Sequence, residues 1–430
     1  MKSLDDIANE LQGYDPKSLT ASAVNGFLDQ LVTPIDGNQT VGIFESLGGV
    51  LDADVISPVN VPPHDNSAMD GFAFDGSALS QQSLSLKVVG TAYAGVPWTG
   101  QVNPGECVQV MTGAIMPHGA DTVVPLELVT LDTGIVTVPA DRLTAGDNRR
   151  MLGEDIQKGA VALKSGDLLT PAALGLLASL GQSQVTIKRK LKVAYFSTGD
   201  EILSLGESPR EGAVYDSNRY TVFGLLHRMG VEMIDMGVVP DQPELLEAAF
   251  VAATAVADAI ITSGGVSVGE ADHTRSMMKK LASNAGGVVF WRIAMRPGRP
   301  MAVGRLAKPG SNDPVILFGL PGNPVAVMVT FLAFVRPALL RMMGCNPQLQ
   351  PLLKAISDEP IRKKPGRTEY QRGLVTTNTD GTVHVRTTGN QGSGVLSSMT
   401  QANGLIVLHH EQGNVAQGEL VDVMMFNGAI

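Results

Sequence analysis

The sequence has little cysteine: Cys107 and Cys345 are the only two thiols in 430 residues. They lie far apart and form neither a CxxC pair nor any other spacing typical of metal ligands. This scarcity excludes a disulfide framework and a cysteine-based zinc site, and it fits a reducing compartment.

Basic charge is also scarce, because 32 Lys and Arg face 42 Asp and Glu, for a net charge of −10. No long Lys/Arg block interrupts the acidic background, so we expect no nucleic-acid partner. The start, "MKSLDDIANELQ", lacks a signal-type apolar stretch, and the longest apolar run, "AVMVTFLAFV", stops at Arg336. That run is too short to span a bilayer. A cytoplasmic enzyme without a membrane partner is the expectation.

What the chain does have is length and many punctuating residues. With 430 residues, 44% of them apolar, it is too long for one hydrophobic core. The 48 glycines and 25 prolines predict many sharp loops. From shifts in apolar periodicity we expect a polar N-terminal extension at 1–18, a helical elongated domain at 19–57 and 149–189, an inserted β domain at 58–148, an α/β domain at 190–341, and a C-terminal β barrel at 342–430.

Helical spacing and capping residues predict the helices outside the α/β region. One helix starts at Ser3, with Asp6 completing a capping box, and another starts with Pro171 after the cap Thr170. Apolar residues at helical intervals predict helices at 20–31 and 40–49 as well, the second ended by glycines.

Between 190 and 340, strand and helix patterns alternate. Helices are expected at 218–229, at 243–256, from 271 and from 323, each following an apolar strand. Such an order predicts a doubly wound, mostly parallel sheet with helices on both faces. The whole chain is therefore an α/β multidomain protein.

Ligands of an open parallel sheet bind beyond the carboxyl ends of its strands. The loops there are 197–201, 239–241, 262–272 and 320–324. In the third, Gly264, Gly265 and Gly269 would let the backbone approach a phosphate-sized anion, with hydroxyls from Ser263 and Ser267. A tight strand-to-helix turn explains this loop about equally well. Neither a GxGxxG fingerprint nor a Walker P-loop is present.

Charged side chains gather around these loops. Carboxylates beside a phosphate require a cation, and Mg²⁺ is the usual one, although the same acids could simply cap helices. The rigid segment 292–300 would bring arginines to an anion, or form a solvated basic loop. The acids are Asp200, Glu201, Asp241, Glu270 and Asp272, and the arginines are Arg292, Arg296 and Arg299, with Arg367, Arg372 and Ser393 as weaker candidates from the last domain.

Two polar turns stand in the inserted β domain. "VPPHDNSAMDG" presents Asp65, Ser67 and Asp70 after a rigid proline approach, and "MTGAIMPHGAD" supplies Thr112 and Asp121. Packing does not require so many polar groups, so these turns suggest one wall of a cleft.

The runs PPHDNSAMDGFAF, VMTGAIMPHGADTVVP, STGDE, YDSNR, TSGGVSVGEADHT and LPGNPVA occur in this order. From about residue 20 to the C-terminus, the chain resembles the molybdopterin molybdenumtransferases, the MoeA type also found as the gephyrin E domain. The resemblance implies hydrolysis of adenylylated molybdopterin with release of AMP as molybdate is inserted, assisted by Mg²⁺. It also implies a homodimer whose cleft lies between the inserted β domain of one subunit and the α/β domain of the other. Molybdopterin adenylyltransferase and a non-catalytic scaffold are the alternatives. The adenylyltransferase and acceptor molybdoenzymes are expected partners.

The resemblance also implies roles for individual residues. Arginines stand where lysines are usual at 292, 296 and 299, and Gln242 replaces an Asp. The implied catalytic residues are Asp70, Thr112, Asp155, Glu201, Asp241 and Asp272, of which Glu201, Asp241 and Asp272 would hold the metal. The substrate would contact Ser197, Thr198, Gly199, Ser263, Gly264, Gly265, Ser267, Gly269, Pro321, Gly322 and Pro324. Molybdate would contact Arg296, Arg372 and Ser393.

Overall fold

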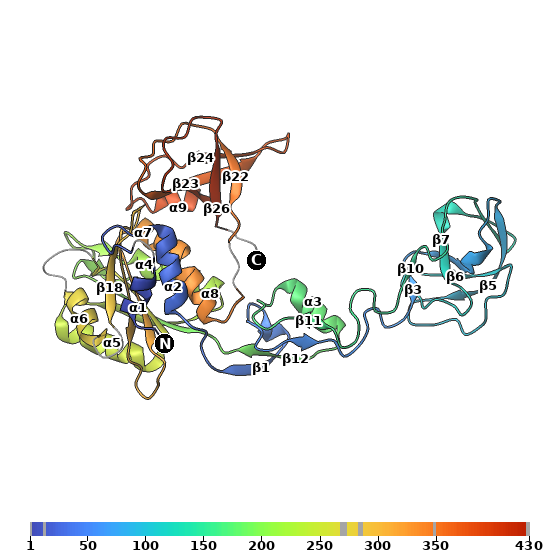
Figure 1. Ribbon diagram of the computed structural model, residues 1–430, viewed down its shortest axis with the longest axis horizontal. Coiled ribbons are helices and arrows are strands. Elements are labelled where there is room, and N and C mark those ends of the chain that lie inside the picture. Colours follow the sequence, from blue (N-terminus) through green and yellow to red (C-terminus); the bar gives the residue numbers. More distant parts are fainter. Residues whose placement is uncertain (1, 12–13, 267–272, 283–286, 347–349, 427–430) are drawn as a thin grey trace.

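The computed structural model describes residues 2–11, 14–266, 273–282, 287–346 and 350–426. The molecule is elongated (Figure 1). An α/β domain and a C-terminal β domain lie at one end, the inserted β domain lies at the other, and a thin region of short strands and one helix joins them.

The α/β domain is built on a six-stranded sheet with the order β16-β13-β17-β21-β20-β18. The first four strands run parallel, and the last two are antiparallel to their neighbours. This confirms the predicted mostly parallel sheet. The strands are β13 (Lys192–Thr198), β16 (Glu232–Val239), β17 (Ala259–Ser263), β18 (Val288–Arg292), β20 (Pro300–Leu306) and β21 (Val315–Leu320).

Helices cover both faces of this sheet, as the alternating pattern predicts. One face packs against α5 (Pro243–Val256) and α6 (His273–Ala282). The other packs against α4 (Ser217–Arg228), the N-terminal helices and the helical segment that follows β21. Every residue of β21 is buried, which is why the strand reads as a continuous apolar run. The start predicted for α6, at residue 271, lies outside the described residues.

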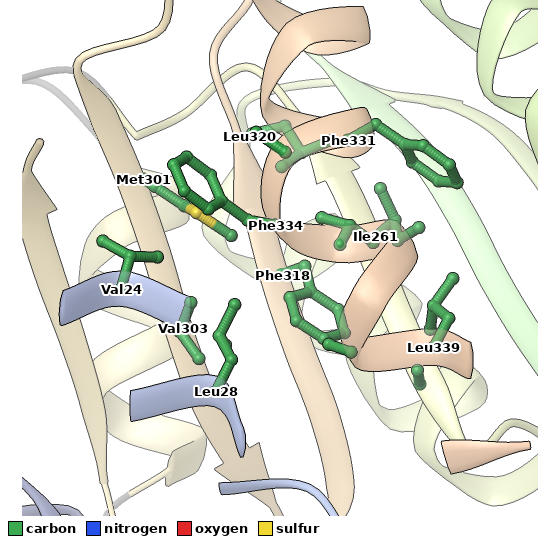
Figure 2. Close-up of a cluster of buried hydrophobic side chains, with 14 of the residues drawn as sticks. Val24, Leu28, Ile261, Met301, Val303, Phe318, Leu320, Phe331, Phe334 and Leu339 are labelled. Atoms are coloured by element: carbon green, nitrogen blue, oxygen red, sulfur yellow. The ribbon is translucent and has the colours of Figure 1, made fainter. Parts of the chain in front are cut away.

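Two N-terminal helices join this α/β core. α1 (Leu4–Glu10) begins with the predicted capping box between Ser3 and Asp6. α2 (Ala21–Leu31) confirms the helix predicted at 20–31, and its buried side chains join the core of the α/β domain. Val24 and Leu28 of α2 point toward the side chains of the sheet (Figure 2). The chain therefore starts in the α/β domain before it leaves for the inserted region.

A long apolar helical segment follows β21. α7 (Pro324–Thr330), a π-helical turn (Phe331–Val335) and α8 (Arg336–Met342) run on without a break. Among the described residues, this 19-residue helix is the one long and apolar enough to cross a membrane. Most of it is buried against the sheet, with Phe331, Phe334 and Leu339 in the core, so it serves as a core helix (Figure 2).

The connecting region corrects one prediction. Residues expected to form a helix at 40–49 instead form β1 (Asn38–Gly42) and a 3₁₀ turn (Phe44–Ser46). β1 pairs with β12 (Gln184–Lys188), so Val41 can pack over Val185 and Ile187. The predicted Thr170 cap is confirmed, since it opens α3 (Pro171–Ser179). β2 (Val55–Ile56) pairs with β11 (Val161–Leu163) nearby.

The inserted domain and the C-terminal domain are both β structures. The inserted sheet has the order β7-β4-β6-β5-β9-β8. In the C-terminal domain, β23-β24-β22-β26-β25 closes into a barrel because β25 also pairs with β23. This confirms the predicted barrel. The strands are β4 (Gly71–Phe74), β5 (Leu84–Ala92), β6 (Glu106–Val110), β7 (Thr122–Pro125), β8 (Thr130–Asp132), β9 (Ile135–Val138), β22 (Leu353–Ser357), β23 (Thr368–Thr377), β24 (Val383–Thr387), β25 (Gly404–Leu408) and β26 (Leu420–Met425).

Candidate functional site

A cavity of about 690 Å³ opens where the α/β domain meets the barrel. β19 (Met295–Arg296) pairs with β23 and holds the two domains together at this point. The cavity is lined by Glu201, Gly264, Gly265, Val266, Met295, Arg296, Pro297, Gly298, Arg299, Pro300, Pro321, Gly322, Asn323, Ala326, Arg367, Gln391, Gly392 and Ser393.

Glycine allows three strand-end loops to meet on this cavity. Gly264 has φ +92°, and a Cβ there would stand 2.5 Å from the Thr198 carbonyl oxygen. Gly265 has φ +64°, and a Cβ there would stand 2.6 Å from Thr274 Oγ1. Both positions therefore exclude a side chain sterically and disfavour one conformationally. The turns at 197–201, 262–266 and 320–324 come together as the sheet topology predicts. Ser267 and Gly269 lie outside the described residues.

The buried hydroxyls of Tyr195, Ser197 and Ser263 hold two of these loops together. Tyr195 Oη lies 2.8 Å from Ser197 Oγ and 2.7 Å from Ser263 Oγ, and the two serine oxygens are 3.1 Å apart. Burial raises the pKa of Tyr195, so its hydroxyl stays protonated. The two serines, predicted to contact substrate, are buried in this triangle and do not line the cavity. Their hydroxyls fix the loops.

The predicted acids lie beside the cavity to different degrees. Glu201 lines it and packs against Gly199, where a Cβ would stand 2.5 Å from the Glu201 carboxylate. Asp241 does not line it, but the Asp241 N–H donates to Asp200 Oδ1 at 3.1 Å, and its carboxylate accepts from Thr274 Oγ1 at 3.3 Å. Asp272 and Glu270 lie outside the described residues.

These acids bear on the expected Mg²⁺. The described residues contain no group of three Asp, Glu, His or Cys side chains placed to hold a metal ion. Mg²⁺ needs no such cage, because it commonly takes one or two carboxylates and completes its shell with water and substrate phosphates. Glu201 and Asp241 are donors of the right chemistry for that partial shell.

Three arginines bring positive charge to the cavity: Arg296, Arg299 and Arg367. Arg367, a weaker candidate from the sequence, lies in the cavity lining. Its Nε and Nη2 reach Glu369 Oε1 at 2.8 and 2.7 Å, and Glu369 is only 2% exposed. The signal was an Arg and a Glu two residues apart, which point to the same face of a strand. Arg292 is exposed and is not part of the lining.

Arg372, predicted to contact molybdate, lies behind the cavity wall. Its side chain is 0% exposed, and the guanidinium donates to Ser398 Oγ and to main-chain carbonyls of residues 390–392. Burial, together with the charge of Arg296, lowers the pKa of Arg372 to about 10. Ser393 does line the cavity, and its Oγ accepts from Asn323 Nδ2 at 3.1 Å. Pro321 and Gly322 line it too, whereas Pro324 begins α7.

The predicted residues of the inserted domain form a second group. The Asp70 carboxylate accepts from the Thr112 N–H at 2.6 Å and from Thr112 Oγ1 at 2.7 Å, and both bonds lower the pKa of Asp70. Asp65 binds Arg149 and the Leu152 N–H. In one chain this group lies far from the cavity, at the opposite end of the molecule (Figure 1).

Asp155 and Asp121 both make hydrogen bonds that hold loops in the inserted region. Asp155 is exposed, and its N–H donates to the Val61 carbonyl oxygen at 3.0 Å. Asp121 Oδ1 accepts the Gly76 N–H at 2.7 Å, so it anchors a turn of the β domain. Asp155 thus lies beside the proline approach, between the inserted sheet and the connecting region.

Comparison with known proteins places these features in a family. Three family descriptions match: the MoeA N-terminal region (domain I and II) at residues 20–181, a probable molybdopterin-binding domain at 194–341, and the MoeA C-terminal region (domain IV) at 354–426. The molybdopterin molybdenumtransferase of Haemophilus influenzae is 42% identical over 93% of this chain and 96% of its own length. That of Nostoc is 33% identical over 96% and 95%.

Solved structures agree with the sequence comparisons. The crystal structure of a molybdopterin biosynthesis moeA protein from Pyrococcus horikoshii superposes with a TM-score of 0.77 at 26% identity, covering 95% of this chain and all of that one. A second structure of a protein of that kind gives a TM-score of 0.69 at 30% identity. The chain therefore belongs to the molybdopterin molybdenumtransferase family and is an enzyme of molybdenum cofactor biosynthesis.

Proposed function

We propose that this protein inserts molybdate into adenylylated molybdopterin, with Mg²⁺-dependent hydrolysis that releases AMP. The observation that carries the proposal is the cavity at the junction of the α/β domain and the barrel. Glycine turns, a carboxylate and three arginines line it together, so it combines groups suited to phosphate, metal and oxyanion.

The molybdate oxyanion would lie on the barrel side. Arg296, Arg299 and Arg367 direct positive charge to this side, and Ser393 adds a hydroxyl. Guanidinium groups bind oxyanions through pairs of N–H donors and keep their charge at any working pH. The Glu369 carboxylate fixes the Arg367 guanidinium, so this donor is oriented before the anion arrives.

The nucleotide end of the substrate would lie on the sheet side. Gly264 and Gly265 let backbone N–H groups approach a phosphate closely. Glu201 and Asp241, with Asp272, would hold Mg²⁺ against the pyrophosphate. When bound, the metal would neutralise phosphate charge in the reaction. The residues of this chain would orient the pyrophosphate, with Pro321 and Gly322 lining the cavity beside Gly264.

A second copy of the chain would complete the site. Asp70 and Thr112 form one hydrogen-bonded unit far from the cavity of their own chain (Figure 1). A homodimer with an active site shared between subunits would place this unit over the partner's cavity. The connecting region exposes apolar side chains suited to such an interface, with Phe44 90% exposed. In the cytoplasm, a molybdopterin adenylyltransferase would supply the substrate, and molybdoenzymes would accept the product.

One assay tests the reaction. Purified protein is mixed with adenylylated molybdopterin, Mg²⁺ and molybdate, and AMP is followed over time. We expect AMP release that depends on both Mg²⁺ and molybdate. Binding without release would favour a scaffold instead, and formation of adenylylated molybdopterin from ATP and molybdopterin would favour the adenylyltransferase.

The Asp272→Asn variant tests the metal assignment, because the amide removes the negative charge that a hard cation requires. We expect AMP release to be lost while the oligomeric state stays unchanged. The matched control is Glu244→Gln, which removes an acid from the first turn of α5 instead. Near-normal turnover by Asp272→Asn would remove this residue from the site.

A further inference from the structure

The turn at 390–393 forms the barrel-side wall of the cavity, and Arg372 lies directly behind it. Gln391, Gly392 and Ser393 line the cavity, whereas Arg372 is fully buried and does not. Arg372 Nη2 donates to the carbonyl oxygens of Asn390 at 3.1 Å and Gly392 at 2.9 Å, and Nη1 donates to that of Gln391 at 3.3 Å. Three successive carbonyls therefore face one guanidinium.

Further bonds lock the turn to the same residue. The Arg372 N–H donates to Gln391 Oε1 at 2.8 Å, and Gln391 Nε2 returns a bond to the Arg372 carbonyl at 3.2 Å. Arg372 Nε donates to Ser398 Oγ at 2.9 Å. No carboxylate accepts from this guanidinium within the described part of the chain. A buried cation held by three carbonyls and one hydroxyl, without a carboxylate, is costly unless it serves a purpose beyond stability.

Peptide geometry gives that purpose. In a trans peptide the N–H points opposite to the C=O of the same unit. Carbonyls of residues 390–392 that face Arg372 thus turn the N–H groups of residues 391–393 to the other side, where the cavity lies. The Gly392 N–H donates to Asn390 Oδ1 at 2.9 Å, but within the described residues the Gln391 and Ser393 N–H groups donate to no protein acceptor. Main-chain N–H groups that point to one side of a turn can form an anion-binding concavity.

We propose that Arg372 is a positioning residue: by holding three carbonyls, it presents the main-chain N–H groups of Gln391 and Ser393 to the oxyanion in the cavity. This inference rests on the proposed function, because molybdate is the anion. The family resemblance implied direct contact between Arg372 and molybdate. In this proposal the main-chain N–H groups make that contact, and Arg372 holds them in place. The bond between the Ser393 carbonyl and the Val325 N–H, at 3.2 Å, then fixes the turn against the start of α7.

The test separates the charge of Arg372 from its geometry. Arg372→Lys keeps the positive charge but cannot bond to three carbonyls and Ser398 at once. With the full-length protein, molybdate binding is measured by equilibrium dialysis, and AMP release gives separate KM values for molybdate and for adenylylated molybdopterin. We expect molybdate affinity to fall at least tenfold, in binding and in KM, while the KM for the adenylylated substrate changes less than twofold.

Ser398→Ala is a second variant with a smaller expected effect, because it removes only the hydroxyl that accepts from Arg372 Nε. We expect a loss of molybdate affinity of about threefold. A folded Arg372→Lys variant with wild-type molybdate affinity would overturn the inference while leaving the proposed function intact. If that variant does not fold, unchanged affinity in Ser398→Ala overturns it instead. Wild-type protein that binds no molybdate would reject the proposed function and this inference together.

Discussion

Single residues set the character of the cavity. Where the family resemblance implies lysines, this chain has Arg296 and Arg299, and both line the cavity. A guanidinium does not lose its proton near neutral pH, whereas a lysine beside other cations can. Arginine in place of lysine at positions 296 and 299 is therefore compatible with binding of an anion in the cavity.

The pair formed by Arg367 and Glu369 gives a prediction. Removing Arg367 alone would leave a buried carboxylate unpaired, so the informative variant is the double change Arg367→Met with Glu369→Gln. We expect the molybdate concentration for half-maximal AMP release to rise roughly 10- to 100-fold, the cost of one lost charged hydrogen bond. The control is Arg362→Gln at an exposed position, which should leave the half-maximal molybdate concentration unchanged. An unchanged half-maximal concentration in the double variant would exclude Arg367 from the oxyanion site.

Asp65 gives a pH prediction. The Leu152 N–H and the Arg149 guanidinium lower the pKa of Asp65. A carboxyl group with a lowered folded pKa adds stability above its unfolded pKa of about 3.9, and this stability is lost as pH falls through the folded value. Wild-type protein should therefore lose more thermal stability between pH 5 and pH 3 than Asp65→Asn does. Melting temperatures across that range check this, and parallel losses would contradict it.

At the scale of elements, the sequence predicted most of the α/β domain. Buried parallel strands are continuous apolar runs, and Thr170 and Ser3 mark helix starts by capping, so local pattern was enough. The error at 40–49 arose because Val41, Phe44 and Leu47 recur at a helical interval, and only pairing with β12 shows that Val41 belongs to a strand. Likewise, local pattern could not separate Arg367 from Arg372, because which side of the barrel wall each occupies depends on closure of the barrel.

The glycine loop after β17 gives a prediction at this scale. Gly265→Ala combines an unfavourable positive φ with a clash against Thr274. Gly310→Ala is matched, since Gly310 has φ +72° but open space around it. The φ penalty is about 1–2 kcal/mol for both, and the clash adds roughly 1–3 kcal/mol to Gly265→Ala. Denaturant unfolding should resolve this difference, and AMP release should fall only in Gly265→Ala. Equal stabilities would show that the loop can move away from Thr274.

At the scale of the whole molecule, the distance between Asp70 and the cavity suggests a complementation test. Asp70→Asn and Asp241→Asn chains, each with its own tag, are co-expressed and purified as a heterodimer. In a shared-site dimer, one site then carries both changes and the other carries none, so we expect about half of the wild-type AMP release per dimer. Each variant alone should be nearly inactive.

The control heterodimer pairs Asp241→Asn with Glu201→Gln. Both changes lie on the α/β side, so every site carries one of them, and no activity should return. If the first heterodimer were also inactive, Asp70 would have to act within its own chain.

The chain leaves the α/β domain after α2 and comes back to it at β13. These two crossings touch, since Arg189 Nε donates to the Asp36 carbonyl at 2.7 Å and the Arg189 N–H donates to the Gly37 carbonyl at 3.1 Å. The whole arm is thus an insertion whose two ends lie side by side. A short peptide joining those ends should leave a core that keeps the cavity between the α/β domain and the barrel. In the proposed shared-site dimer, that core could no longer supply Asp70 and Thr112 to its partner. Arms of a different length, or with different polar turns at their far end, could be joined at those ends without changing the α/β domain or the barrel.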